Sequence, residues 1–194
     1  MNKYYLGVDL GSTTSKAVII NENDEIIGRG ITNTRANYKV AADIARQEAI
    51  YNARFNFLKR LLKDEIRIHP EYELYIKDIE SVFQYLQFKK RLDSLLEQMQ
   101  HTAANNFPEN IKQEVQNNIT DIFYSIEPSI RNDYITGDLG SKNQFFRDIV
   151  NEKYSEEVKK LNIDIFEPMM LVLDKSITPV ENQLFEFDFR ALVY

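Results

Sequence analysis

The sequence predicts a mixed α/β chain (α+β if the chain is taken by itself), with a short N-terminal β-meander followed by a long, mainly helical region. Apolar and polar residues alternate up to about residue 32, as they do in half-buried strands. From Tyr38 onward the apolar period changes to three or four, as in amphipathic helices. The 194 residues include only 6 Gly and 5 Pro, too few for a disordered or fibrous chain.

Three strands are expected at residues 4–10, 15–20 and 25–31. The polar runs from Gly11 to Thr14 and from Asn21 to Asp24 have the composition of turns, so the strands should form an antiparallel meander. Three strands do not form an independent core by themselves. Either the helices cover the sheet, or further strands belong to it.

Helical spacing predicts five helices, at residues 38–68, 71–104, 109–127, 141–161 and 165–176. Pro128 is expected just past the end of the third helix, and Pro168 in the first turn of the fifth. The residues from Leu184 to Phe189 fit either a strand or a helix, and both alternatives stay open. The apolar face expected for the first helix consists of Val40, Ile44, Tyr51, Phe55, Leu58, Leu62 and Ile66.

Composition excludes several classes of function. The net charge of −6 opposes binding to nucleic acid, because phosphate neutralisation needs a clustered basic excess. The chain has no cysteine, which excludes disulfides, thiolate metal sites and cysteine nucleophiles within it. No apolar stretch reaches the ~20 residues of a membrane span, and the N-terminus lacks the pattern of a signal peptide. We therefore expect a cytoplasmic protein that binds neither nucleic acid nor membranes.

The turn between the first two strands has the residue types of a phosphate-binding loop. Gly11 allows close backbone approach, so that N–H groups and hydroxyls of the turn can point at phosphate oxygens. Asp9 can hold Mg²⁺ directly or through water, and Lys16 adds a positive charge for phosphate. The candidate phosphate-binding residues are Gly11, Ser12, Thr13, Thr14 and Lys16, and Asp9 is the candidate catalytic and metal-binding residue.

Two common nucleotide motifs do not fit this sequence. The turn is not a Walker A loop, because Lys16 does not directly follow a glycine and a strand comes next. Gly28-Arg29-Gly30 lacks the third glycine and the following helix of a dinucleotide-binding loop. A hairpin turn rich in hydroxyl residues, with Asp9 and Lys16 present by chance, is the alternative interpretation.

The segment from Leu6 to Val18 resembles the first phosphate motif of the acetate-kinase, sugar-kinase, Hsp70 and actin superfamily. Within that superfamily the chain resembles the BadF/BadG/BcrA/BcrD ATPase family. Residues 28–38, 47–55, 145–149 and 174–177 are similar to the large ATPase subunit of ATP-dependent (class I) benzoyl-CoA reductase. The resemblance covers nearly all of this chain, but only the first part of that subunit.

The resemblance implies that residues 1–37 are the first strands of a ribonuclease-H-like ATPase half-domain of the actin and Hsp70 type. Residues 38–194 would then be a helical insertion domain. It also implies an activity, in which hydrolysis of ATP with Mg²⁺ drives low-potential electron transfer into a reductase that dearomatises benzoyl-CoA. The implied partners are a paired ATPase subunit, the reductase subunits and a ferredoxin as electron donor.

Several features of that family are missing from this sequence. The second phosphate motif, the glycine-rich adenosine motif and the cysteines of a [4Fe-4S] cluster are absent, and no glycine neighbours another glycine. The cluster would therefore belong only to the complete subunit pair. We expect a fragment or split-gene product that is inactive alone. Two alternatives stay open, a small-molecule kinase of the same superfamily and a non-catalytic module that binds partner subunits.

Overall fold

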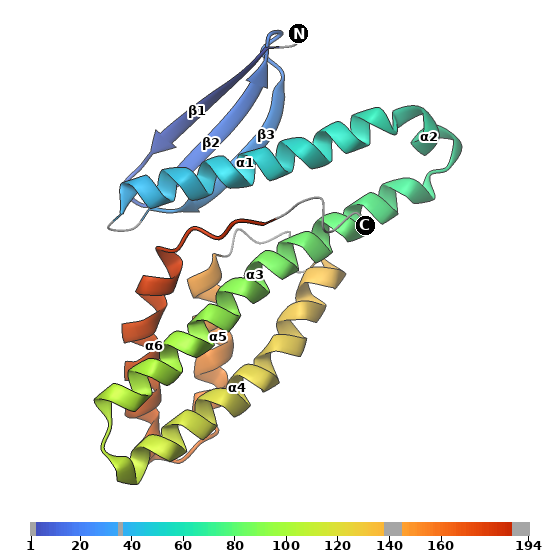
Figure 1. Cartoon of the computed structure of the whole chain (residues 1–194). Coiled ribbons are helices and arrows are strands. Elements are labelled where there is room, and N and C mark those ends of the chain that lie inside the picture. Colours follow the sequence, from blue (N-terminus) through green and yellow to red (C-terminus); the bar gives the residue numbers. More distant parts are fainter. Residues whose placement is uncertain (1–2, 35–36, 138–144, 188–194) are drawn as a thin grey trace. The chain divides into compact units, whose positions relative to one another are not determined.

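The computed structural model describes residues 3–34, 37–137 and 145–187 (Figure 1). The described residues form a three-stranded antiparallel sheet followed by a mostly helical remainder. This arrangement confirms the mixed fold class expected from the sequence, whereas the ribonuclease-H-like fold stays a prediction.

The chain divides into two compact units, one of Met1–Glu80 with the segment from Glu186, and one of Ser81–Phe185. We call them the sheet unit and the helical unit. The boundary expected after residue 37 follows the ATPase resemblance rather than compactness, and stays a prediction.

The sheet consists of β1 (Tyr4–Leu10), β2 (Thr14–Asn21) and β3 (Ile26–Asn33), in the order β1-β2-β3. Both pairs are antiparallel, so the predicted meander is confirmed. In the β2–β3 turn, the side-chain oxygen of Asn21 accepts hydrogen bonds from the N–H groups of Asn23 and Glu25. Asp24 has a φ of 60°, a conformation that Asp adopts more readily than most residues. Short polar side chains therefore close this turn.

Helix α1 (Tyr38–Leu61) covers β2 and β3 through a contact between small residues. A Cβ atom built on Gly30 would lie 2.6 Å from the amide nitrogen of Ala49, and one on Gly28 would lie 2.8 Å from the Cβ of Ala53. The helix can approach β3 this closely because both strand residues lack a Cβ. The buried cluster of this interface consists of Ala17, Ile19, Ile27, Ala45, Ala49 and Ala53.

The apolar face predicted for α1 is buried at Ile44, Tyr51 and Phe55, but it is not the face that packs on the sheet. Tyr51 instead contacts the chain at Phe187, with ring centroids 6.5 Å apart and its hydroxyl 3.4 Å from the carbonyl oxygen of Phe187. Helix α1 thus has two buried faces, of which the alanine face lies against the sheet.

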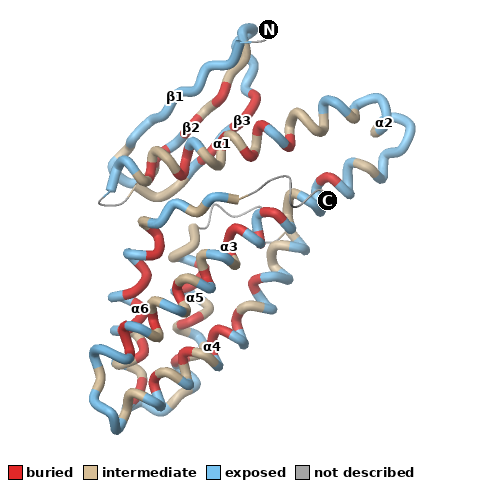
Figure 2. Tube along the Cα trace, in the orientation of Figure 1, coloured by how far each residue is buried: buried red, intermediate tan, exposed pale blue. Residues whose placement is uncertain are grey.

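Strand β1 is exposed along its whole length, whereas β2 and β3 contain buried residues (Figure 2). It is an edge strand, and among the described residues it pairs only with β2. Apolar side chains along it remain accessible, from Val8 with 39% exposure to Tyr5 with 54%. Helix α1 therefore covers only part of the meander.

The single helix predicted for residues 38–68 is interrupted. Helix α1 ends at Leu61, and the short helix α2 covers Lys63–Ile68. Leu62 between them has φ −92° and ψ 11°, outside the helical range. Leu61 is 83% exposed and α2 has no buried residue, so tertiary packing does not hold the helix regular here. The predicted end before His69 is confirmed.

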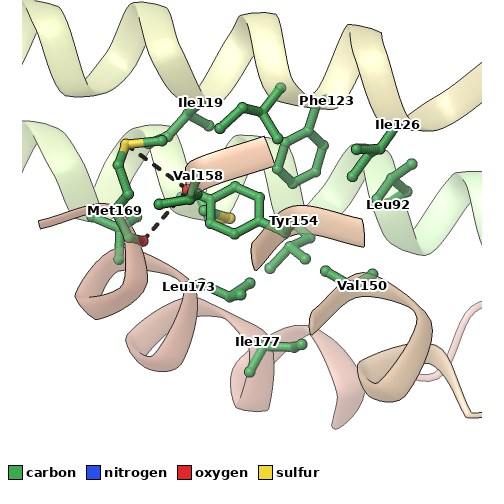
Figure 3. Close-up of a cluster of buried hydrophobic side chains, with 14 of the residues drawn as sticks. Leu92, Ile119, Phe123, Ile126, Val150, Tyr154, Val158, Met169, Leu173 and Ile177 are labelled. Carbon is green, nitrogen blue, oxygen red and sulfur yellow. Dashed lines mark hydrogen bonds between the residues drawn. The ribbon is translucent and has the colours of Figure 1, made fainter. Parts of the chain in front are cut away.

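The remaining helices are α3 (Glu71–Asn106), α4 (Glu109–Thr136), α5 (Phe146–Val158) and α6 (Ile163–Glu181). The core of the helical unit is built around Tyr154, whose side chain is completely buried (Figure 3). The Tyr154 ring meets Phe123 edge to face at 6.2 Å, and its hydroxyl lies 3.4 Å from the carbonyl oxygen of Met169. Other fully buried side chains are Leu95, Met99, Val115, Ile119, Ile130, Val150, Leu173 and Ile177.

One ion pair links α5 to α6 at the margin of this core. The guanidinium of Arg147 donates to Glu181 Oε2 from Nη2 at 2.8 Å and from Nε at 3.0 Å, and Nη2 also donates to Thr178 Oγ1 at 2.7 Å. The Glu181 side chain is only 5% exposed and that of Arg147 is 32% exposed. Burying a charged carboxylate is unfavourable unless charged groups donate hydrogen bonds to it. Arg147 provides this compensation for Glu181.

Three prolines lie inside helices, which corrects two predicted ends. Helix α4 continues through Pro128 to Thr136, and α6 continues through Pro168 and Pro179 to Glu181. Because α6 begins at Ile163, Pro168 lies beyond its first turn. The apolar stripe continues past each proline, with Ile130 and Val180 fully buried, and this burial outweighs the local cost of proline.

Two other predicted ranges also change. Helix α5 ends at Val158, three residues earlier than expected, and the start expected at residue 141 lies outside the described residues. Residues 183–187 form neither a strand nor a helix, and the rest of the undecided segment, residues 188 and 189, is not described.

Candidate functional site

The β1–β2 turn places its two hydroxyl residues at an exposed tip. The Gly11 N–H donates to the carbonyl oxygen of Thr14 at 3.1 Å, which closes the turn around Ser12 and Thr13. A Cβ atom on Gly11 would lie 2.7 Å from that same oxygen. Only glycine therefore fits this tight turn without displacing its backbone.

Asp9 and Lys16 are direct cross-strand partners in the register of β1 and β2. Successive side chains of a strand point to opposite faces. Ser15 and Ala17 are buried whereas Lys16 between them is exposed, so Lys16 and its partner Asp9 share the face away from α1. The structure thus brings together the carboxylate and the ammonium group that the sequence suggested for one site.

Both charged groups are available for a ligand. Among the residues that the structure describes, no ion pair or hydrogen bond joins the side chain of Asp9 or Lys16 to another group. The same holds for the hydroxyls of Ser12 and Thr13 and for their backbone N–H groups at the turn tip. An exposed turn with unpaired N–H donors, two hydroxyls and a nearby lysine has the donor set that phosphate oxygens accept.

The turn is tied to the end of β3 by two hydrogen bonds. The Thr34 N–H donates to the carbonyl oxygen of Thr13 at 2.8 Å. The hydroxyls of Ser15 and Thr34 lie 2.6 Å apart, and Ser15 is completely buried. The sequence predicts no role for either residue, although alternation along β2 is consistent with Ser15 on the buried face.

Asp9 is the carboxylate nearest to this turn in the register of the sheet. No group of three or more His, Cys, Asp or Glu side chains that could hold a metal is found in the described part of the chain. A lone carboxylate fits Mg²⁺, which usually keeps several waters and binds one or two carboxylates together with substrate phosphates. It does not fit a structural metal site, which needs a complete set of protein ligands.

A second feature is a shallow depression in the helical unit, lined by Leu96, Gln100, Gln113, Gln116, Asn117 and Thr120. Gln100 Nε2 donates to the Gln116 carbonyl oxygen and to Thr120 Oγ1, each at 2.8 Å. These amide groups connect α3 to α4, so a structural role accounts for them.

None of the helices described here is long and apolar enough to cross a lipid bilayer. We also compared the chain with protein-family models, with curated proteins and with solved structures. None of the three comparisons gave a match.

Proposed function

We propose that the β1–β2 turn binds the phosphates of ATP together with Mg²⁺. In this proposal Gly11, Ser12, Thr13, Thr14 and Lys16 contact phosphate, and Asp9 holds Mg²⁺ or its bound water. The observation that carries the proposal is the cross-strand pairing of Asp9 with Lys16 beside a tight turn. Among the described residues, the N–H and hydroxyl groups of Ser12 and Thr13 in this turn are unpaired. Mg²⁺ and lysine would then neutralise the same phosphate groups from neighbouring strands.

The wider role follows from the resemblance of the segment from Leu6 to Val18 and of the later segments. The chain would be the phosphate-binding part of an ATPase subunit of the BadF/BadG/BcrA/BcrD family. That subunit would couple ATP hydrolysis to low-potential electron transfer for the reduction of benzoyl-CoA or a related aromatic acyl-CoA. A [4Fe-4S] cluster would be held by other parts of the assembly, because this chain has no cysteine.

We expect binding rather than turnover from this chain by itself. Phosphoryl transfer needs positive charge and hydrogen-bond donors around the transferred group, and this sequence offers one phosphate turn without the family's second motif. Binding should be weak, with contacts limited to phosphate and Mg²⁺. Mg²⁺-dependent ATP hydrolysis that is lost in Asp9→Ala would contradict this expectation.

The test is a titration of the ¹⁵N-labelled chain with Mg·ATP, followed through the amide resonances of Gly11 to Thr14. We expect saturable shifts at the turn, with an affinity that falls about tenfold or more in Lys16→Gln. Arg29→Gln is the matched control. It removes the same charge from the same face of the sheet, because Arg29 pairs with Val18, two residues along β2 from Lys16.

For the carboxylate, Asp9→Asn is compared with Asp24→Asn, which makes the same change in the β2–β3 turn. In Asp9→Asn the difference between binding of Mg·ATP and of metal-free ATP should disappear, whereas Asp24→Asn should preserve it. Equal behaviour of the two variants would remove Asp9 from the site. Absence of turn shifts in the wild-type chain would refute the proposed function.

A further inference from the structure

Thr34 makes hydrogen bonds to two adjacent parts of the β1–β2 turn. Its N–H donates to the carbonyl oxygen of Thr13 at 2.8 Å, and its hydroxyl lies 2.6 Å from that of Ser15. Thr13 and Ser15 flank Thr14, so a single residue fixes the main chain on one side of Thr14 and a side chain on the other. The turn itself is closed by the hydrogen bond from the Gly11 N–H to the carbonyl oxygen of Thr14.

Burial makes the hydroxyl contact specific. Ser15 is completely buried, and a buried hydroxyl without a hydrogen-bond partner is unfavourable by the full desolvation penalty. Thr34 Oγ1 is the partner of Ser15 in the structure. Because threonine is branched at Cβ, its side chain has restricted rotamers, so fixing its hydroxyl also restricts its backbone. The Ser15 hydroxyl therefore constrains the Thr34 N–H that holds Thr13.

Thr34 also connects the turn to the rest of the sheet unit. It directly follows Asn33, the last residue of β3 and the partner of Thr14. Asn37, three residues further on, caps α1 by accepting a hydrogen bond from the Val40 N–H at 3.2 Å. Through Thr34 the turn is thus attached to the end of β3, close in sequence to the start of α1.

We infer that the Ser15–Thr34 hydroxyl pair positions the β1–β2 turn for phosphate, so that both are positioning residues of the site. This inference rests on the proposed function and adds two residues that do not themselves contact phosphate. With the pair intact, the unpaired N–H groups of Ser12 and Thr13 are already oriented when a ligand arrives. Preorganised donors bind more tightly because less ordering entropy is lost on binding.

The first measurement needs no ligand. Amide hydrogen exchange is compared in the wild type, Thr34→Val and Ser15→Ala, with Thr32→Val as matched control. Thr32 pairs with Ser15 in the sheet, and no hydrogen bond of its side chain is present among the described residues. We expect exchange at Gly11 and Thr34 to become about tenfold faster in the first two variants, while α1 and the Thr32→Val control keep the wild-type rates. Unchanged exchange at the turn would overturn the inference.

The second measurement is titration of the same variants with Mg·ATP and with inorganic pyrophosphate. Affinity should fall about three- to tenfold in Thr34→Val and in Ser15→Ala, in line with the loss of one hydrogen bond. The double variant should bind no more weakly than the weaker single variant, since each change removes the same interaction. Thr34→Ser keeps the hydroxyl and should retain most of the affinity, which also protects the test against a valine variant that fails to fold.

The outcomes separate the two proposals. A wild-type chain that binds neither ligand refutes the proposed function. The exchange rates still show whether the Ser15–Thr34 pair stabilises the conformation of the β1–β2 turn. A wild-type chain that binds, with the same affinity as Thr34→Val and Ser15→Ala, refutes the positioning role and leaves the proposed function in place.

Discussion

Gly30 lies directly against the backbone of α1 at Ala49, where a Cβ atom on the strand residue would be 2.6 Å from the Ala49 amide nitrogen. Gly28 has the corresponding position against Ala53. At these two glycines β3 and α1 are therefore in contact through their main chains.

The first prediction concerns this contact. Gly30→Ala should destabilise the sheet unit by about 2–3 kcal/mol or more, because the added methyl group meets main-chain atoms that cannot rotate away. Urea unfolding followed by the amide resonances of β2 and β3 would measure the change. Gly7→Ala is the control, since a Cβ there meets nothing within 4 Å. It should be neutral or slightly stabilising. Equal losses in both variants would argue against the close contact.

The second prediction concerns stability at alkaline pH. Burial raises the pKa of the Tyr154 hydroxyl well above its ordinary value, and burial together with a hydrogen bond to the Glu127 carboxylate raises the pKa of Tyr85. Because the folded state holds these protons more tightly than the unfolded state, their contribution is complete below about pH 10 and is lost as the pH rises further. The loss should approach about 1.4 kcal/mol per pH unit for each tyrosine.

Urea unfolding between pH 8 and pH 11.5, followed through the helical signal, would measure the free energy of unfolding at each pH. Tyr154→Phe should make the alkaline decline shallower, because the ionisable group is gone. Tyr124→Phe removes a hydroxyl from a residue that is 74% exposed, and should leave the slope unchanged. A Tyr154→Phe variant with the wild-type slope would show that this hydroxyl does not contribute.

The third prediction concerns the ion pair between α5 and α6. Arg147→Ala removes a guanidinium from a carboxylate that is 5% exposed, and should cost the helical unit about 2–4 kcal/mol. Lys89→Ala removes a cation from Asp93, which is 57% exposed, and should cost below about 0.5 kcal/mol. Thermal unfolding would measure the loss of stability in both variants. Equal losses would show that the Arg147–Glu181 ion pair contributes no more than an exposed one.

The fourth prediction is an alternating exchange pattern along β1. The bond from Gly11 to Thr14 marks that pair as hydrogen-bonded, so Asp9 and Gly7 should bond to β2, while Val8 and Leu6 direct their N–H groups to the free edge. Amide exchange should therefore be slow at residues 7 and 9 and fast at 6 and 8. Uniform protection along the strand would show that the edge is covered in solution.

The strands could be predicted to within two residues because alternation and turn residues are local signals. The face of α1 that packs on the sheet could not be predicted, because large apolar residues such as Tyr51 and Phe55 dominate the helical periodicity of this segment. The contact instead depends on alanines and glycines, whose contribution lies in their small size. A signal was present in Ala45, Ala49 and Ala53 at a spacing of four, opposite two glycines in a strand.

In the candidate site, too, one contact could be predicted from local sequence and another could not. The cross-strand pairing of Asp9 with Lys16 follows from the length of the turn and from strand periodicity, so the sequence could suggest it. The contact between Ser15 and Thr34 depends on where β3 ends relative to the turn, which is a matter of register between strands that are distant in sequence. The positions of the prolines in α4 and α6 differ from the prediction because burial of the apolar stripe outweighs the local preference of proline for helix ends.

Helix α6 illustrates what such burial means for the order of folding. A peptide of its sequence contains two internal prolines, each unfavourable by about 3 kcal/mol in a helix interior, so it should not be helical in water. Its helical conformation depends on the packing of Met169, Leu173 and Ile177 against side chains of α3, α4 and α5. During synthesis those three helices emerge first and expose their apolar faces until α6 is available. We therefore expect the nascent helical unit to be a substrate for chaperones that bind apolar surfaces.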